Sequence, residues 1–115
     1  MLPQRSPGVV LISEDPFVSS YLRCLLRRQG YEVLQADTRR AAEMVRGGTV
    51  AVDVLITNTP AAFHSCAEDV PLLYLSAAPD MDLVPPFRRC RVLPKPFHPD
   101  ELLAVVGELA EPGVR

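Results

Sequence analysis

The stretch that decides the fold is Asp53-Val54-Leu55-Ile56-Thr57-Asn58, a short apolar run that begins at an acid and ends at an amide. A second apolar run, Val9-Val10-Leu11-Ile12, lies near the start of the chain. Short continuous apolar runs are typical of parallel strands that are buried on both faces of a sheet. The two runs therefore predict a sheet with parallel strands.

Strands and helices alternate along the rest of the chain. Strand-like runs cover residues 9–12, 31–34, 52–57, 72–75 and 91–93. A first helix is expected after Asp15, a good N-terminal cap, with Pro16 at its first position. A second helix is expected to begin with Thr38 as its cap, and a last one begins at Pro99. Alternation of this kind with short links predicts a doubly wound α/β sheet with helices on both faces.

Two connections are too short for regular helices. Between the third and fourth strands, only residues 59–69 could form a helix, and a parallel crossover normally needs about a dozen residues. The segment 76–90 contains Pro79, Pro85 and Pro86, and proline interrupts helices. At most one short helix, at residues 80–84, is expected there. The third and fourth helices are therefore predicted to be shortened or missing.

Composition excludes several classes of function. The chain has 115 residues, 48% of them hydrophobic and 23% charged, as is typical of one globular domain. We expect that domain at residues 9–110, with flexible tails at 1–8 and 111–115. A formal charge of −2 gives no general attraction to nucleic acid. No apolar run reaches the about 18 residues of a membrane span, and no signal peptide is recognised, so a cytoplasmic protein is expected.

Polar side chains follow the predicted strands in a recognisable order. The stretch Ser13-Glu14-Asp15 follows the first strand, Ser76 follows the fourth, and Lys95-Pro96-Phe97 follows the fifth. In this order and spacing, residues from Val9 to Leu109 resemble a response-regulator receiver domain. The resemblance implies a flavodoxin-like fold, which is a five-stranded parallel sheet in the order 2-1-3-4-5.

The resemblance also implies roles for individual residues. In that family, a histidine kinase transfers a phosphoryl group to an aspartate after the third strand, acids after the first strand hold Mg²⁺, and a hydroxyl and a lysine contact the phosphoryl group. The corresponding residues here are Asn58 at the phosphoacceptor position, Ser13, Glu14 and Asp15 at the acidic positions, Ser76 at the hydroxyl, Lys95 at the lysine, and Val92 at an aromatic position that reports switching.

Two of these positions lack the chemistry that the family uses. A carboxylate oxygen is the nucleophile that forms an aspartyl phosphate, and the amide of Asn58 has no such oxygen. Mg²⁺ prefers carboxylate ligands, and Ser13 and Asn58 each lack a carboxylate that the family would have there. Only Glu14 and Asp15 remain as candidate ligands. We therefore expect no bound Mg²⁺, no other cofactor and no enzymatic activity.

Lys95 is the only lysine in the chain and lies between two prolines. Without a phosphoryl group to contact, its ammonium is expected to pair with Glu14 or Asp15, or to bond the oxygen of Asn58. The resemblance implies that the peptide bond after this lysine is cis, since X-Pro bonds are the usual site of cis peptides. Ser76 is expected to cap the end of its strand.

Three functions fit these observations. The first and favoured one is a pseudo-receiver, a protein-interaction module of bacterial signalling that works without phosphorylation. Its partner would be a histidine kinase, an output domain or a second copy of the chain. The second is a receiver phosphorylated elsewhere, at Asp53 or Asp15, although Asp53 begins its strand and so lies at the wrong end of the sheet. The third is a small enzyme or nucleotide-binding module, but Gly47-Gly48 follows a helix and no glycine-rich phosphate loop is present.

The short connections also predict where a partner binds. In a sheet of this connectivity, the first and last helices share one face, and the opposite face, which we call the thinned face, has incomplete cover. Apolar surface is expected to remain there near Leu73, Leu75 and Val92. The side chains expected to cover part of it and to form the interface are Phe63, Leu83, Val84 and Phe87. A partner is expected on this thinned face and not on the face of the first helix.

Overall fold

The computed structural model of the chain describes residues 8–48 and 50–111. The elements in these residues are, in chain order, β1 (Val9–Ser13), α1 (Pro16–Arg28), β2 (Glu32–Gln35), α2 (Thr38–Gly47), β3 (Val54–Thr57), the 3₁₀ helix η1 (Pro60–Cys66), β4 (Leu72–Ser76), the 3₁₀ helix η2 (Met81–Leu83), β5 (Cys90–Pro94) and α3 (Pro99–Ala110). The tails expected at 1–8 and 111–115 lie outside the described residues except for their inner ends, Gly8 and Glu111.

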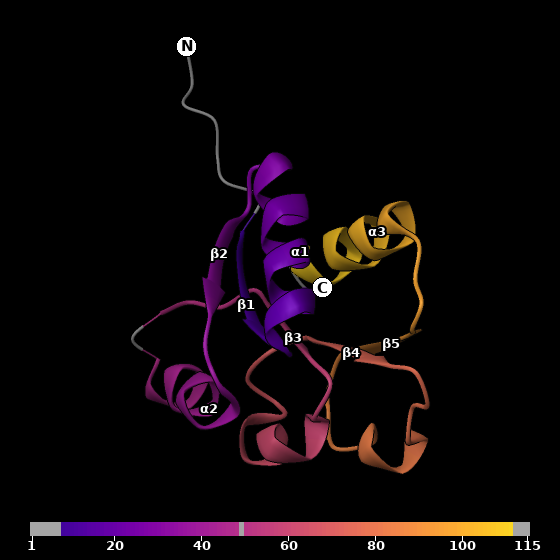
Figure 1. Cartoon of the computed structure of the whole chain (residues 1–115). Coiled ribbons are helices and arrows are strands. Elements are labelled where there is room, and N and C mark those ends of the chain that lie inside the picture. Colours follow the sequence, from indigo (N-terminus) through magenta and orange to yellow (C-terminus); the bar gives the residue numbers. More distant parts are fainter. Residues whose placement is uncertain (1–7, 49, 112–115) are drawn as a thin grey trace.

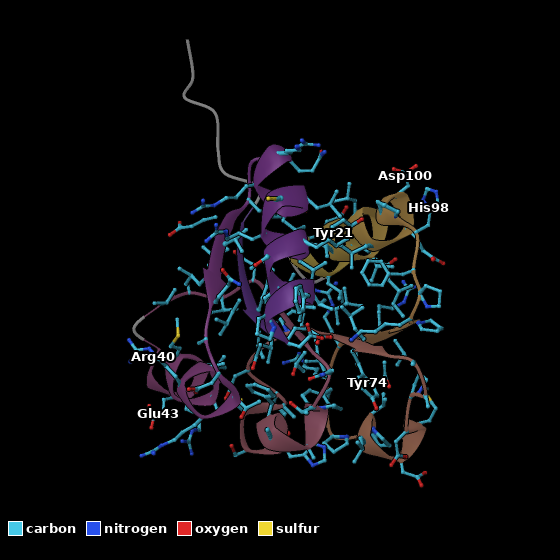
Figure 2. All side chains as sticks on the ribbon, in the orientation of Figure 1. Tyr21, Arg40, Glu43, Tyr74, His98 and Asp100 are labelled. Carbon is cyan, nitrogen blue, oxygen red and sulfur yellow. The ribbon has the colours of Figure 1, made fainter. Side chains whose placement is uncertain are left out.

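The predicted sheet is confirmed. The described residues form a five-stranded sheet in the order β2-β1-β3-β4-β5, and every neighbouring pair is parallel. Figure 1 shows α1 and α3 on one side of this sheet and α2 with the two short helices on the other. Side chains from both sides fill the space between the sheet and its helices (Figure 2).

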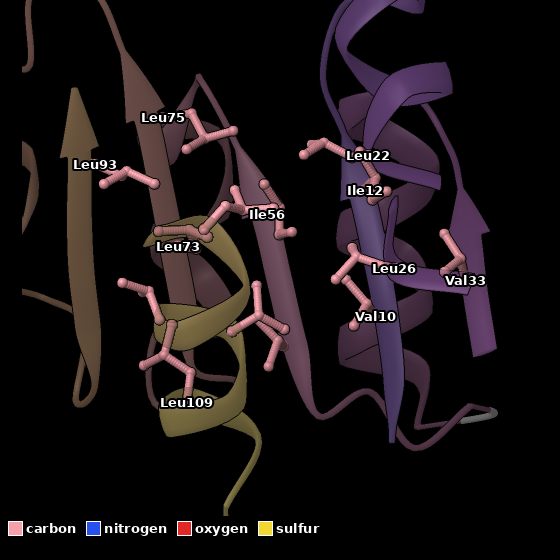
Figure 3. Packing of buried hydrophobic residues seen from close by; sticks show 14 residues of the cluster. Val10, Ile12, Leu22, Leu26, Val33, Ile56, Leu73, Leu75, Leu93 and Leu109 are labelled. Atoms are coloured by element: carbon pink, nitrogen blue, oxygen red, sulfur yellow. The ribbon is translucent and has the colours of Figure 1, made fainter. Parts of the chain in front are cut away.

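The face of α1 and α3 has a complete apolar core (Figure 3). Leu22 and Leu26 of α1 and Leu102 and Val106 of α3 are fully buried against the central strands. Burial of such a side chain contributes about 1.5–3 kcal/mol relative to leaving it in water. In each helix the two residues are four positions apart, which places them on one side of the helix.

On the thinned face, large single side chains add to the cover that α2 and the two short helices provide. Phe63 of η1 is fully buried and Phe87, before β5, is almost so. The ring of His64 packs edge-on against Phe87 at a centroid distance of 5.6 Å, and its Nε2 lies 3.1 Å from the carbonyl oxygen of Leu83. These contacts tie η1 to η2, so the two short helices cover the sheet as one unit.

The predicted apolar surface on this face is wrong for Leu73 and Leu75, whereas the predicted cover by Phe63 and Phe87 is confirmed. Leu73 and Leu75 belong to the core beneath α1 and α3 and are fully buried. Phe63 and Phe87 do lie on the thinned face, but their burial leaves them no surface for a partner. Some apolar surface does remain on this side, where Met81 of η2 is 58% exposed and Leu83, Val84 and Val92 are half-buried.

The helix ends follow capping chemistry, with one correction. Asp15 caps α1 as predicted, because its Oδ1 accepts a hydrogen bond from the backbone N–H of Val18 at 3.0 Å. The cap of α2 is Asp37 and not Thr38, since the carboxylate of Asp37 accepts from the N–H of Arg40 at 2.8 Å. Thr38 is already helical. Asp37 has the extended backbone that a cap residue needs, and its side chain reaches the third helical residue.

No helix of the described residues could cross a bilayer. The longest helix among them, α1, has 13 residues, whereas a transmembrane helix needs about 20.

Candidate functional site

The carboxyl ends of the strands bring the predicted site residues together. Ser13, the last residue of β1, pairs with Thr57 of β3, so Asn58 follows directly at the same edge. On the other side, Ser76 of β4 pairs with Pro94 of β5, and Lys95 follows. Ligand sites of doubly wound sheets lie at this edge because every parallel strand ends there. The chain order alone therefore assembles the candidate site.

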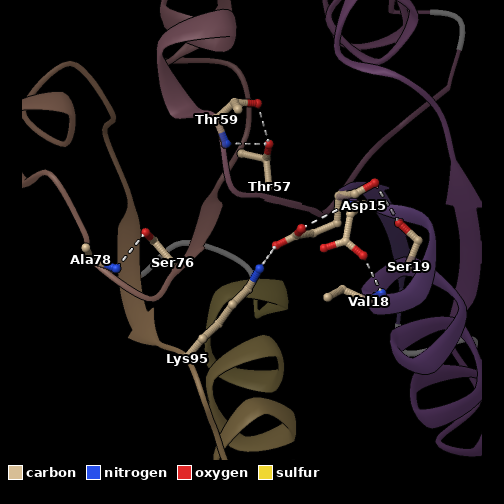
Figure 4. Close-up of polar contacts among 9 residues, drawn as sticks. Asp15, Val18, Ser19, Thr57, Thr59, Ser76, Ala78 and Lys95 are labelled. Carbon is tan, nitrogen blue, oxygen red and sulfur yellow. Dashed lines mark hydrogen bonds and ion pairs between the residues drawn. The ribbon is translucent and has the colours of Figure 1, made fainter.

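An ion pair between Lys95 and Glu14 occupies the centre of this edge (Figure 4). The Nζ of Lys95 lies 2.9 Å from Oε2 of Glu14, and the Glu14 side chain is 0% exposed. Oε1 of the same carboxylate accepts a hydrogen bond from the N–H of Asp15 at 2.9 Å. Oε2 has no well-directed hydrogen bond, so the ammonium is the group that compensates its charge. Of the partners predicted for Lys95, Glu14 is confirmed.

The backbone aims the lysine at this carboxylate. The peptide bond between Lys95 and Pro96 is cis, as the resemblance implied. The N–H of Lys95 donates to the carbonyl oxygen of Ser76 at 2.9 Å, which holds the residue against the end of β4. The Lys95 side chain is 23% exposed, so its stem is covered while its charge faces Glu14.

Asn58 is exposed at the edge, and its side chain makes no hydrogen bond with another described residue. Beside it, the hydroxyls of Thr57 and Thr59 lie 3.2 Å apart, and the N–H of Thr59 donates to Oγ1 of Thr57 at 3.1 Å. Ser13 is buried and carries no charge. No carboxylate nucleophile is therefore present at the position where the resemblance puts one.

The residues at this edge do not fit Mg²⁺. A hard dication needs several oxygen ligands with negative charge. Glu14 is already neutralised by Lys95, and the carboxylate of Asp15 is used to cap α1. The described residues contain no group of three or more His, Cys, Asp or Glu side chains that could hold a metal ion. The donor set matches an internal ion pair better than a metal centre.

The remaining predicted residues have structural roles. Oγ of Ser76 accepts a hydrogen bond from the N–H of Ala78 at 3.1 Å, which confirms it as a strand-end cap. Val92 is half-buried beside the core of the thinned face. Asp53, an alternative phosphoacceptor, lies at the opposite edge of the sheet, where its Oδ2 accepts from the N–H of Val9 at 2.7 Å.

Sequence reasoning missed an exposed aromatic group beside α1. Tyr21 recurs at helical spacing with core residues, which predicts burial, but it is 45% exposed. It packs against Phe97, with ring centroids 6.3 Å apart, and Phe17, one turn earlier, is 89% exposed. A signal was available, because Phe17 and Tyr21 are four residues apart and thus share a stripe of the helix.

Comparison with known proteins gives matches by structure alone. No protein-family model and no curated protein matches the sequence. The receiver domain of the hybrid histidine kinase CckA superposes with a TM-score of 0.69 at 23% identity, covering 90% of this chain and 100% of that chain. A response regulator from Chloroflexus aurantiacus has a TM-score of 0.73 at 24% identity, covering 90% and 98%.

A third structure contains the metal that the family implies. The receiver domain of a sensor histidine kinase from Pseudomonas aeruginosa, solved with a magnesium ion coordinated in its active-site cleft, has a TM-score of 0.71 at 21% identity and covers 90% of this chain and 97% of that chain. At such identities the likeness concerns the fold. This chain has the fold of a response-regulator receiver domain.

Proposed function

We propose that this chain is a pseudo-receiver of bacterial two-component signalling, which acts through protein contacts and does not accept a phosphoryl group. Its partners would be a histidine kinase, an output domain or a second copy of the chain, in the cytoplasm. The protein would have no catalytic activity of its own and would need no Mg²⁺.

The observation that carries this proposal is the ion pair of Lys95 with Glu14 beside an uncharged Asn58. In a phosphorylated receiver, the resemblance gives the lysine a phosphoryl group to contact and the acids a metal to hold. Here the lysine and the acid neutralise each other at 2.9 Å within the protein. The site is electrostatically satisfied without a ligand, which favours one constant state over a phosphorylation switch.

The alternative acceptors have weaker support. Asp53 lies at the edge of the sheet opposite to Lys95, where its Oδ2 accepts a hydrogen bond from the N–H of Val9. Phosphorylation at Asp15 would modify the carboxylate that caps α1. Asp53 has no lysine at its edge of the sheet, and the lysine nearest to Asp15 is already paired with Glu14, so neither carboxylate has a free lysine to stabilise the charge of the transferred group.

The proposal is tested with small phosphoryl donors. The native chain is incubated with acetyl phosphate and Mg²⁺ and its intact mass is measured, and amide NMR spectra are recorded with beryllofluoride and Mg²⁺. We expect no mass increase and no change in the spectra at Asn58 or Lys95. A Mg²⁺-dependent phosphoryl adduct on the native chain would sink the proposal.

A further inference from the structure

Asn58 is the only asparagine in the chain, and it is exposed at the end of β3. Asparagine is among the thermolabile residues of proteins, because its amide can be lost by reaction with the backbone. The backbone nitrogen of the next residue, here Thr59, bonds to Cγ of the asparagine, and ammonia leaves with the proton of that N–H. Water then opens the resulting succinimide ring to an aspartate or, when the other carbonyl bond breaks, to an isoaspartate.

Both products would change the candidate site. Aspartate is the nucleophile that the receiver family has at this position, so this reaction would supply the missing carboxylate without a mutation. Isoaspartate would add one carbon to the backbone directly after Thr57, at the edge where Thr57 pairs with Ser13. A chain that works with an amide at Asn58 therefore depends on a slow reaction.

The structure restrains the nitrogen that would attack. The N–H of Thr59 donates a hydrogen bond to Oγ1 of Thr57 at 3.1 Å (Figure 4). Thr57 is the last residue of β3 and is 0% exposed, so the sheet fixes the position of its hydroxyl. To attack, the nitrogen has to lose its proton and turn toward Cγ of Asn58. Both steps require that this hydrogen bond breaks.

Other contacts hold Thr59 from the opposite side. Its carbonyl oxygen accepts a hydrogen bond from the N–H of Ala62 at 3.1 Å. Pro60, the first residue of η1, is buried, and its ring restricts the backbone directly after Thr59. The hydroxyls of Thr57 and Thr59 lie 3.2 Å apart. Thr59 therefore cannot turn toward Asn58 without the loss of several contacts together.

We propose that Asn58 is a deamidation site that the hydroxyl of Thr57 protects. Thr57 is a positioning residue, since it acts on the reaction through the N–H of Thr59. The consequence for signalling rests on the proposed function, in which the amide keeps the chain from accepting a phosphoryl group. The two proposals can fail separately. Phosphorylation of the freshly prepared chain would overturn the proposed function and leave the deamidation rates unchanged, whereas rapid loss of ammonia would leave the inertness of the fresh chain as it is.

The test incubates the full chain in warm, mildly alkaline buffer and follows its charge by isoelectric focusing. Each chain that loses the amide gains one negative charge, and peptide mapping by mass spectrometry assigns the change to Asn58. The same chain unfolded in urea gives the rate without the contacts. We expect the folded chain to react about fivefold or more slowly, the factor that corresponds to one hydrogen bond. Equal rates in the folded and unfolded chains would overturn the proposal.

A matched pair of substitutions isolates the hydroxyl. Thr57→Val keeps the size and the branch of the buried side chain but removes the acceptor, so it should deamidate about fivefold faster than the native chain. Thr57→Ser keeps the acceptor and loses only a methyl group, and it should stay close to the native rate. Thr59→Val keeps both the N–H and its acceptor, and it should also stay close to the native rate.

Circular dichroism checks that each variant is folded. If folded Thr57→Val loses ammonia no faster than Thr57→Ser, the hydroxyl does not protect Asn58 and the proposal is excluded. A second measurement needs no variant. The amide proton of Thr59 in the native chain should exchange with solvent about fivefold or more slowly than in the urea-unfolded chain, because it is hydrogen-bonded to Thr57. Exchange at the unfolded rate would exclude the proposal even if Thr57→Val did not fold.

Discussion

At the scale of the single residue, the chain pairs a buried carboxylate with a lysine from another strand. The carboxylate of Glu14 is withdrawn from water, and such a charge is costly unless it is paired. Lys95 supplies that pair from the end of β5, at 2.9 Å. Lys95 is thus the structural counter-ion of Glu14.

This role predicts a stability effect that a signalling lysine would not show. Lys95→Met should lower the free energy of unfolding by about 3 kcal/mol, because it leaves a buried carboxylate without a partner. The value lies at the low end for broken buried pairs, since part of the Lys95 side chain is exposed. Urea denaturation measures the change.

The matched control removes both charges. Glu14→Gln/Lys95→Met should be more stable than Lys95→Met alone, because no uncompensated charge remains and the amide oxygen can still accept from the N–H of Asp15. If Lys95→Met unfolds within about 0.5 kcal/mol of the native chain, the ion pair is not a structural element.

At the scale of the elements, two short 3₁₀ helices cover the part of the sheet that two regular helices would otherwise cover. A short helix covers little sheet area, so cover has to come from large side chains that reach inward. Phe63 does this from η1 and Phe87 from the segment after η2. Tyr74 fixes the loop from the sheet side, since its hydroxyl accepts from the N–H of Asp80 at 3.0 Å.

Loss of such a side chain should therefore be severe. Phe63→Ala is expected to cost about 3–5 kcal/mol, because neighbouring elements are too short to collapse into the cavity. Met81→Ala, which changes an exposed residue of η2, should stay within about 0.5 kcal/mol of the native chain. Thermal denaturation of both variants measures these changes in stability. Equal melting temperatures would show that η1 does not seal the thinned face.

The positions of the elements could be predicted from the sequence, but not the direction of every side chain. Apolar runs, prolines and glycines indicated each strand and each helix, including the short ones. The face of the sheet on which each side chain of β4 lies could not be predicted, because Leu72, Leu73, Tyr74 and Leu75 are all buried. A parallel strand with cover on both faces has no polar alternation that would show which residue faces which helix. The placement of Leu73 and Leu75 on the thinned face was wrong for that reason.

At the scale of the whole molecule, the candidate site was more predictable than the surface. Four site residues each follow or end a strand: Ser13, Asn58, Ser76 and Lys95. Parallel strands place such residues at one edge of the sheet, independently of the loops that connect the strands. The exposed aromatic group beside α1 was not predictable in the same way. Tyr21 has core spacing, and only the packing of α1 against α3 and Phe97 shows that it is left partly in water.

Because the edge is assembled by the fold, receiver chemistry should be recoverable by substitution. Asn58→Asp alone restores the nucleophile but leaves the metal site short of charge, so at most weak phosphorylation is expected. Ser13→Asp/Asn58→Asp adds two carboxylates beside Glu14, and the ligand set then suits Mg²⁺. This double variant should bind Mg²⁺, melt at a higher temperature in its presence and gain a phosphoryl group from acetyl phosphate.

Two further measurements make this prediction specific. Melting with and without Mg²⁺ reports the metal site even where phosphorylation is slow, and Ser13, being buried, requires that the double variant first be shown to fold. Adding Asp53→Asn at the opposite edge should not change Mg²⁺ binding, because Asp53 contacts the N–H of Val9 and lies away from the site. If the folded double variant neither binds Mg²⁺ nor accepts a phosphoryl group, then Lys95 stays paired with Glu14 even when two carboxylates are added beside it. The edge would then be held by a structural ion pair, and two substitutions would not be enough to make it a receiver site.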